Sequence, residues 1–221
     1  MWIKSFKVIE KLYPSAHWHF PVDDGRTFLT FDDGPHPSIT PWVLDKLDEF
    51  NARATFFCLG KNVEKYPEIY REIIARGHRT GNHTFNHKNG WKTANKDYYE
   101  DIRKAAGVID SDLFRPPYGK IRSSQLYALK KEYCIVMWTL LSMDFDKKIS
   151  PQQCLKNVTG YMTKGAVVVF HDSEKAEKNM KYALEGTLVK LAEAKMSSES
   201  IPVKKQEQAQ SLQLNQPIIN G

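Results

Sequence analysis

The sequence predicts an α/β fold in which helices cover a parallel sheet, and two patterns lead to that prediction. Short apolar segments rich in β-branched and aromatic residues alternate with amphipathic segments of helical period. The apolar segments are hydrophobic at successive positions, which is typical of strands buried on both faces. Repeated β-then-α units of this kind form either a closed or nearly closed barrel or an open doubly wound sheet, and the pattern fits both.

Length and composition favour a single domain. The chain has 221 residues, of which 41% are hydrophobic, enough for one sizeable core. Lys and Arg exceed Asp and Glu by 32 − 26 = 6, and the basic residues are spread along the chain. A dispersed charge is typical of a solvated surface, so we expect no nucleic-acid partner. No glycine-rich phosphate-binding pattern follows a predicted strand, which argues against nucleotide binding.

The first three predicted elements are two strands with a helix between them. Residues 26–31 (RTFLTF) predict a strand, and the glycine and proline at 34–35 end it. A helix is expected at 41–51, where Thr40 is suited to the N-cap and a proline occupies the first turn. Residues 54–59 (ATFFCL) are continuously apolar and predict a buried strand.

Two helices and a short strand follow. Residues 67–75 carry apolar side chains at helical spacing, and Gly77 ends that helix. Residues 96–109 form a charged amphipathic segment for which Asn95 is a suitable cap. Residues 113–114 predict a short strand because two prolines follow closely.

The remaining elements continue the alternation. A helix at 124–132 precedes an apolar strand at 134–139 (CIVMWT). Ser150 is a good start for the next helix because proline and glutamine follow in the positions that capping favours. The most apolar strand, at 166–170, leads to the last long helix at 175–195.

We therefore expect a lead-in segment at 1–25, one domain at 26–195 and a polar tail at 196–221. The tail holds few apolar residues, so we expect it to be disordered or loosely attached. The N-terminus lacks an apolar run of signal-peptide length, and no segment approaches the ~20 apolar residues needed to span a bilayer. The expectation is a soluble, cytoplasmic protein. Three cysteines without a CxxC pair are expected as buried, reduced thiols: Cys58, Cys134 and Cys154.

Two adjacent carboxylates, Asp32 and Asp33, follow the first predicted strand. Touching acids repel each other and lose solvation, so a nearby cation would stabilise them. Taken alone, the pair is better explained as a surface Asx-turn before a glycine and a proline. Neighbouring strand residues point to opposite faces, so the two acids need not share one role.

His83 and His87 are four residues apart in the segment HTFNH. On a helical turn, which Asn82 could cap, this spacing places both rings on one face. The same spacing also arises by chance on solvated loops, so by itself it is weak evidence for a metal site. Combined with Asp32 or Asp33, however, the histidines make a two-His, one-carboxylate set, the composition of a catalytic metal centre with open positions.

Further polar residues stand where predicted strands end. Arg115, in RPPYG, follows the short strand, Asp144 follows the strand at 134–139, and His171 directly follows 166–170. Arginine can hold a carboxylate, and a histidine can protonate a leaving amine. Taken singly, each residue can also be explained without a catalytic role: Arg115 as part of a surface ion pair, Asp144 as a loop acid and His171 as a structural histidine. Polar groups at the same end of successive strands mark the expected active site of an α/β fold, so their convergence is the stronger signal.

Five segments in order resemble the motifs of the polysaccharide deacetylases, also called the NodB-homology family or carbohydrate esterase family 4. They are TFDDGP, HTFNH, RPPYG, an aspartate after a tryptophan-containing strand, and VFH. The resemblance implies a distorted (β/α)7 barrel as a single catalytic domain at 26–195. It also implies metal-dependent removal of N-acetyl groups from N-acetylglucosamine-containing poly- or oligosaccharides of the peptidoglycan or chitin type.

Carried over by position, the resemblance makes Asp32 the catalytic base and Asp33 a metal ligand together with His83 and His87. The implied metal is zinc, with cobalt or nickel as alternatives. In this mechanism a metal-bound water, deprotonated by the base, attacks the acetyl carbonyl.

The resemblance also implies roles for residues around this centre. Arg115 would orient Asp32, and the backbone N–H of Tyr118 would stabilise the oxyanion. Asp144 would tune His171, which would serve as the general acid. One departure is a phenylalanine after Asp144, where the family commonly has tryptophan, and another is the lack of a closing apolar strand after the last helix. The candidate substrate-binding residues are Pro117, Tyr118, Trp138 and Phe145.

Three alternatives to the N-deacetylase remain at this stage. The same fold and metal could act on acetyl esters of xylan or on a small non-carbohydrate amide. Two histidines and a carboxylate also suit a non-haem iron oxygenase. The third alternative is a non-catalytic saccharide-binding relative. The sequence leaves the natural glycan and the oligomeric state open.

Overall fold

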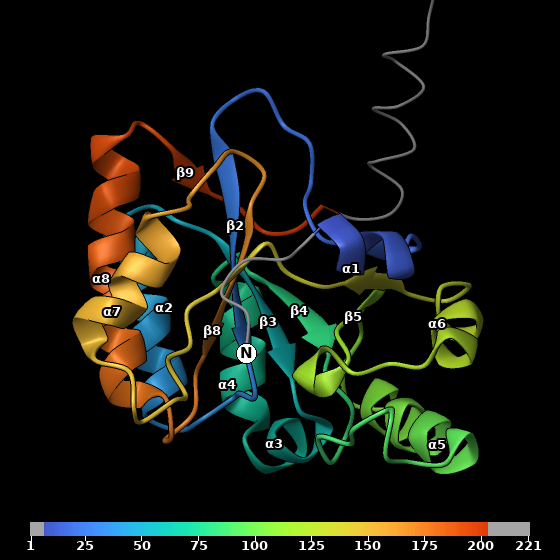
Figure 1. The fold of residues 1–221 in the computed structure, drawn as a ribbon. Helices are drawn as coiled ribbons and strands as arrows, with labels where there is room; N and C mark the ends of the chain where they lie inside the picture. The colour runs from blue at the N-terminus through green and yellow to red at the C-terminus, as the bar shows by residue number, and fades with distance from the viewer. Residues whose placement is uncertain (1–6, 203–221) are drawn as a thin grey trace, which may run out of the picture.

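A computed structural model describes residues 7–202 and shows a curled parallel sheet surrounded by helices (Figure 1). The strands are β1 (Ala16–His17), β2 (Arg26–Asp32), β3 (Ala54–Cys58), β4 (Arg79–Asn82), β5 (Leu113–Phe114), β6 (Cys134–Val136), β7 (Leu140–Leu141), β8 (Val167–His171) and β9 (Ser197–Ser198). Their order is β1-β6-β5-β4-β3-β2-β8-β7, with β9 paired to β2, and every ladder is parallel.

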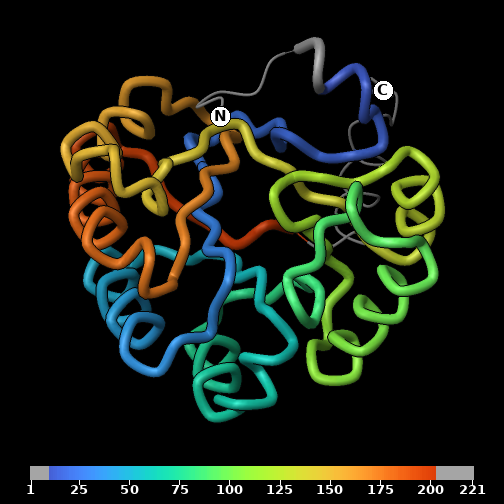
Figure 2. Tube along the Cα trace, turned by 60° about the horizontal axis from the view of Figure 1, so that its bottom comes forward, coloured from blue at the N-terminus to red at the C-terminus, as the bar shows by residue number. Residues whose placement is uncertain are grey.

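Figure 2 shows the helices as a ring around the strands. The helices are α1 (Lys7–Leu12), α2 (Ile39–Glu49), α3 (Gly60–Lys65), α4 (Pro67–Ala75), α5 (Asn95–Ala106), α6 (Ser123–Leu129), α7 (Pro151–Thr159) and α8 (Glu177–Glu193), with a 3₁₀ turn at Pro117–Gly119. In Figure 1, α2, α7 and α8 lie on one side of the sheet and α5 and α6 on the other. Helices α2 to α8 each lie in the chain between one strand and the next, as a β/α barrel requires.

The barrel closes where the lead-in and the connection after β6 meet the start of β8: His19 bridges Ala166, and the Phe20 N–H donates to the carbonyl of Gly165 at 3.0 Å. Residues 137–139 run directly from β6 to β7, which lie at opposite sides of the sheet path. Met137 N–H donates to the carbonyl of His17 (2.8 Å), and the Thr139 hydroxyl donates to the carbonyl of Trp18 (2.6 Å). The first of these bonds continues the pairing of β1 with β6, and the second joins the connection to the lead-in without a regular ladder. The barrel is therefore distorted there, and the expected distorted (β/α)7 barrel is confirmed.

Burial on both faces explains the continuous hydrophobicity of the strands. Along β2, Leu29 and Phe31 pack into one large cluster with residues of α2 and α8, whereas Phe28 belongs to a second, smaller cluster. The Phe31 ring stacks between Phe56 of β3 and Phe170 of β8, at 5.0 and 5.8 Å. The central strands are thus fixed relative to one another, and their carboxyl ends are held rigidly.

Several sequence-based boundaries need correction. The strand expected at 134–139 is two strands, β6 and β7. The helix expected at 41–51 begins at Ile39, and Thr40 lies inside it, where its hydroxyl bonds Asp172. The residues of HTFNH are not helical, because Thr84 and His87 have positive φ angles of 64° and 59°.

Both expected flanking segments contribute to the barrel. In the lead-in, β1 pairs with β6, and Phe20 is buried against Phe28. In the expected tail, β9 pairs with β2 and Ile201 is fully buried. Residues 196–202 are therefore ordered, contrary to the prediction, because one buried isoleucine and a few backbone bonds suffice to hold them; the rest of the predicted tail lies outside the described residues.

Two smaller predictions can also be compared with the structure. Cys58, Cys134 and Cys154 are free and buried, as expected. Within residues 7–202, none of the helices is both long and apolar enough to cross a membrane. The cellular location stays a prediction.

Candidate active site

The predicted site residues gather at the carboxyl ends of the strands, around a cavity of about 610 Å³. Asp32 ends β2 and His171 ends β8, and the two are paired directly across the sheet. Asp33 has a φ of 82°, so the chain leaves the strand and both aspartates line the same cavity. The expectation that they point to opposite faces is wrong, because only the first of them is in extended conformation.

Asp33, His83 and His87 form a compact cluster. The Oδ1 atom of Asp33 lies 3.2 Å from Nε2 of His87 and 3.8 Å from Nε2 of His83. One ligand atom from each residue lies within 4.8 Å of the others. The predicted ligand set is therefore assembled, although by a loop and not by the helical turn that the spacing suggested.

This cluster fits a divalent cation. His83 Nδ1 contacts the carbonyl of Arg115 at 2.8 Å, and since a carbonyl only accepts, Nδ1 carries the proton and Nε2 presents a lone pair. Burial lowers the pKa of both histidines, that of His87 to about 4, so both rings are neutral near neutral pH. Asp33 Oδ1 is buried without a hydrogen-bond partner among the described residues. Three acceptors facing one another in this way repel unless a cation lies between them.

Neighbouring elements fix the cluster. Asn62 of α3 donates to the carbonyl of Asp33 at 2.7 Å. Asp101 of α5 accepts from the backbone N–H groups of Phe85 and Asn86, both at 2.9 Å, and from the Asn86 side chain at 2.6 Å. Hydrogen bonds to the buried carboxylate of Asp101 therefore hold the loop that carries the two histidines in place.

Asp32 is bound to a fully buried arginine. Arg115 Nη1 donates to Asp32 Oδ1 and to the Thr30 hydroxyl, both at 2.7 Å, and its other nitrogens donate to the carbonyls of Val136 and Met137. Burial alone would raise the pKa of Asp32, but the Arg115 charge lowers it below its usual range. The carboxylate stays ionised, and its Oδ2 atom faces the cluster, 3.9 Å from His83 Nε2.

Asp144 keeps His171 protonated. Their Nδ1 and Oδ1 atoms are 2.7 Å apart, and the second oxygen of Asp144 accepts from the His171 backbone N–H at 2.7 Å. Burial would lower the pKa of His171, but the fully buried Asp144 raises it to about 9. The site thus contains an ionised acid and a protonated histidine at neutral pH, the pairing that acid–base catalysis requires.

Aromatic side chains line the cavity, including three of the four predicted substrate-binding residues. Tyr118, Trp138 and Phe145 are among the lining residues, whereas Pro117 is buried and the preceding proline lines the cavity instead. The Phe145 ring stands edge-on to His171, with 5.0 Å between centroids. Phenylalanine therefore forms a wall at this position despite the departure from tryptophan. Tyr118 has a left-handed φ of 62°, a strained conformation that clusters at functional sites.

Sequence reasoning missed several residues that support the site. Asp101 carried one detectable signal, since it shares the buried stripe of α5 with Tyr98 and Ile102. Asp172 accepts from the Gly34 backbone N–H at 3.1 Å and from the Thr40 hydroxyl, which holds the turn that carries Asp33. Nothing in the local sequence pointed to the contacts of Thr30 or Asn62, because both depend on distant segments.

Comparison with known proteins agrees with this geometry. The family model described as "Polysaccharide deacetylase" matches residues 21–133. A peptidoglycan-N-acetylglucosamine deacetylase of Bacillus cereus is 38% identical over 160 residues, which cover 69% of this chain and 58% of that protein. A second one from the same organism is 31% identical over 74% of this chain and 81% of its own length. The chain thus spans less than two thirds of the first relative.

A solved structure shows the same fold. The crystal structure of the Bc1960 peptidoglycan N-acetylglucosamine deacetylase superimposes with a TM-score of 0.80 at 32% sequence identity. The match covers 90% of this chain and 95% of that one.

Proposed function

The chain belongs to the polysaccharide deacetylase family, and from this premise we propose that it removes N-acetyl groups from N-acetylglucosamine-containing poly- or oligosaccharides by metal-dependent hydrolysis. The observation that carries the proposal is the arrangement of three groups around one cavity. An ionised carboxylate, Asp32, and a protonated imidazole, His171, flank a cluster suited to a divalent cation. The names of the similar proteins, peptidoglycan N-acetylglucosamine deacetylases, support this substrate class.

Asp33, His83 and His87 would hold the cation, and we propose zinc, with cobalt or nickel as substitutes. Two imidazole nitrogens and one carboxylate oxygen are a common ligand set of catalytic zinc. A divalent cation held by these three residues would polarise the acetyl carbonyl and lower the pKa of water.

The protein's own groups move the protons. Arg115 donates a hydrogen bond to Asp32 Oδ1. Oδ2 is therefore the oxygen that can take a proton from the attacking water. The Tyr118 N–H is proposed to donate to the oxyanion that forms at the former carbonyl. His171 then gives its Nε2 proton to the leaving amine, because Nδ1 is engaged by Asp144.

The protonated histidine favours an amide over an ester as the substrate. An amine is a poor leaving group unless it receives a proton, whereas an alkoxide leaves more readily. The buried Asp144 keeps that proton on His171 up to a pH of about 9. The aromatic walls formed by Tyr118, Trp138 and Phe145 suit the apolar faces of a sugar ring.

Acetate release tests the proposal. Purified protein of measured metal content is incubated with N-acetylglucosamine oligomers, peptidoglycan fragments and acetylated xylan. We expect acetate from the first two classes. Release from xylan alone would reverse the amide assignment, and absence of release from every amino sugar would refute the proposed function. Iron in the protein with oxygen-dependent turnover would indicate an oxygenase instead.

A further inference from the structure

We propose that Asp172 is a positioning residue: it holds Asp33, a ligand of the proposed cation, at a fixed place relative to His171, the proposed acid. The inference rests on the proposed function and assigns a role in it to a carboxylate outside the cavity lining. Asp172 is 1% exposed and is not among the residues that line the cavity. Its effect on the reaction must therefore pass through the residues that it binds.

Asp172 extends the pairing of β2 with β8 beyond the end of both strands. At the amino end of this ladder, the Phe28 N–H donates to the carbonyl of Ala166 at 2.9 Å. The bonds of a parallel ladder repeat every two residues, so six residues further the Gly34 N–H should meet the backbone carbonyl of Asp172. Because the chain turns at Asp33, where φ is 82°, the Gly34 N–H meets the Asp172 side chain instead, and Oδ1 accepts it at 3.1 Å.

Asp172 therefore holds Asp33 from both sides. Its own N–H donates to the carbonyl of Asp32 at 3.2 Å, and its carboxylate binds the N–H of Gly34. These two residues stand directly before and after Asp33, so the position of the proposed ligand is tied to the end of β8. His171 precedes Asp172 in the chain. A single residue thus links the turn that carries the ligand to the acid.

The second oxygen of Asp172 fixes the rest of the turn. Oδ2 accepts from the Thr40 hydroxyl, whose oxygen accepts from the His36 backbone N–H at 2.8 Å. A β-carbon at Gly34 would overlap the carboxylate, so the close approach of these two groups requires glycine. None of the ion pairs within residues 7–202 includes Asp172. Burying a carboxylate without a cationic partner costs free energy, so stability alone does not account for this residue.

The test replaces Asp172 and measures the reaction, zinc binding and stability separately. The reaction is followed as kcat and KM for acetate release from N-acetylglucosamine oligomers, zinc affinity by competition with a chelator, and stability by urea unfolding. Asp172→Ala should lower kcat at saturating zinc about 10- to 100-fold and weaken zinc binding by a similar factor. KM should stay within about 2-fold of wild type, because the cavity lining is unchanged. Asp172→Asn keeps an oxygen that accepts from Gly34, so its kcat should stay within about 3-fold of wild type.

Gly34→Ala tests the same contact from the other side. The added methyl group displaces the Asp172 carboxylate, so kcat and zinc affinity should fall as they do in Asp172→Ala. In the double variant the methyl group fills space that the carboxylate has left. Its loss of kcat should therefore not exceed that of Asp172→Ala alone, whereas losses that multiply would overturn the inference.

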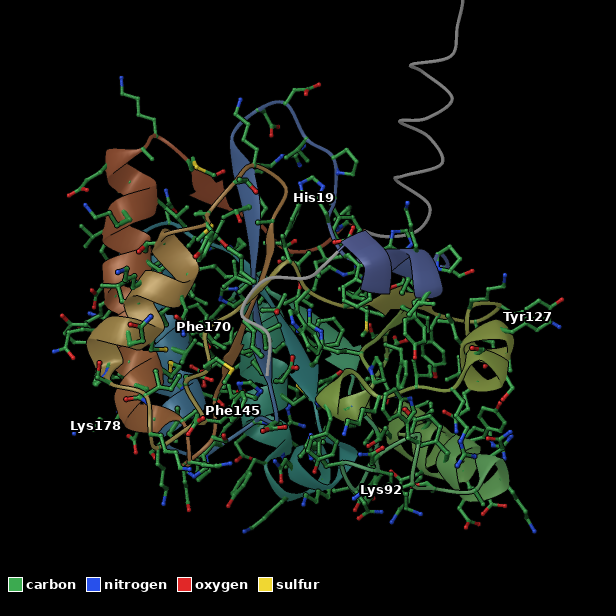
Figure 3. The ribbon with its side chains drawn as sticks, viewed as in Figure 1. His19, Lys92, Tyr127, Phe145, Phe170 and Lys178 are labelled. Carbon is green, nitrogen blue, oxygen red and sulfur yellow. The ribbon has the colours of Figure 1, made fainter. Side chains whose placement is uncertain are left out.

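Thr27→Val is the matched control, because Thr27 joins the same two strands at their amino end. Its hydroxyl donates to the carbonyl of Ala166 at 2.9 Å. Ala166 is bridged to His19, which lies at the opposite end of the molecule from Phe145 of the cavity (Figure 3). Thr27→Val should lower the free energy of unfolding and leave kcat and zinc affinity unchanged.

Three further results would overturn the inference: wild-type kcat and zinc affinity in Asp172→Ala, an Asp172→Asn protein impaired as severely as Asp172→Ala, or an equal loss of kcat in Thr27→Val. If Asp172→Ala does not fold, Gly34→Ala takes its place in each comparison. If the wild-type protein releases no acetate from any saccharide, the proposed function fails, and zinc affinity decides the role of Asp172 separately. Weaker zinc binding in Asp172→Ala but not in Asp172→Asn supports positioning, whereas weakening in both or in neither contradicts it.

Discussion

Asp32 and Asp33 are neighbours in sequence but differ in their surroundings. Asp32 is 4% exposed and bonded to the buried Arg115. Asp33 faces His83 and His87 through an oxygen without a hydrogen-bond partner among the described residues. The repulsion between two adjacent acids is relieved on one side by arginine and would be relieved on the other by a cation in the cluster. The pair therefore supports two different roles, base and ligand.

Replacing Asp32 with asparagine separates these roles. The amide keeps the shape of the side chain but cannot accept the proton from water, so kcat for acetate release should fall about 10²- to 10⁴-fold. The zinc content of the purified protein, measured by atomic emission, should not change. Loss of zinc in Asp32→Asn, or turnover close to wild type, would contradict this assignment. Asp33→Ala, the neighbouring control, should lose both zinc and activity.

Asp144 sets the pH range in which His171 carries its proton. Burial alone lowers the pKa of His171, and Asp144 raises it to about 9. Asp144→Asn should therefore shift the alkaline limb of the kcat–pH profile to lower pH and reduce kcat near neutrality. An alkaline limb at the wild-type position in Asp144→Asn would show that His171 is not the acid.

The same pair links stability to pH. His171 binds its proton more tightly in the folded chain than in the unfolded chain, where its pKa is about 6.5. Its contribution to stability is thus complete below that pH and is lost as the pH rises through about 9.

At the scale of elements, the loop between β4 and α5 depends on one helix. Asp101 of α5 is 5% exposed and accepts three hydrogen bonds from Phe85 and Asn86. These bonds stabilise a backbone in which Thr84 and His87 have positive φ angles. The helix therefore positions His83 and His87, two of the three proposed metal ligands, through the loop that carries them.

Asp101→Ala should destabilise the protein and weaken metal binding together. It leaves buried N–H groups unpaired, at a cost of about 2–3 kcal/mol in the free energy of unfolding. Disordering the loop should weaken zinc binding about 10- to 100-fold. Urea unfolding and competition with a zinc chelator measure the two effects. Glu100→Ala, on the exposed side of the same helix, should change the free energy of unfolding by less than about 0.5 kcal/mol. Unaltered zinc affinity in Asp101→Ala would show that the loop holds its shape unaided.

The sequence predicted the site better than it predicted the loops that build it. Asp32, Arg115 and His171 stand at the ends of apolar strands. Because the carboxyl ends of parallel strands lie at the same edge of a sheet, the sequence correctly predicted that these three residues lie close together. The conformation of HTFNH was predicted wrongly because histidine spacing carries no information about Asp101, fourteen or more residues away in the chain. Side-chain contacts between distant segments decide such loops, and local propensity does not.

At the scale of the whole molecule, the barrel is completed by the lead-in and by the start of the tail, two segments that the sequence placed outside the domain. β1 extends the sheet beside β6, and β9 pairs with the start of β2. Ile201 is fully buried in the cluster that also contains Phe28 and Phe57. Neither strand shows a hydrophobic pattern, since both are only two residues long. This explains why the domain boundaries were placed too far inward.

Ile201→Ala tests the corrected boundary. Removing a buried isoleucine side chain should lower the free energy of unfolding by about 2–5 kcal/mol, measured by urea denaturation. Val189→Ala, at an exposed position of α8, is the control and should cost less than about 0.5 kcal/mol. A similarly small effect of Ile201→Ala would place the end of the domain before this residue.

The central claim is that a cation at Asp33, His83 and His87 and the flanking acid and base together hydrolyse an N-acetyl group. The most direct measurement is acetate release from N-acetylglucosamine oligomers by one preparation before chelation, after chelation and after zinc is restored. The proposed mechanism predicts release, loss of release and recovery, with zinc binding at one equivalent per chain. Undiminished acetate release from metal-free protein, or no release from the zinc-loaded protein, would contradict it.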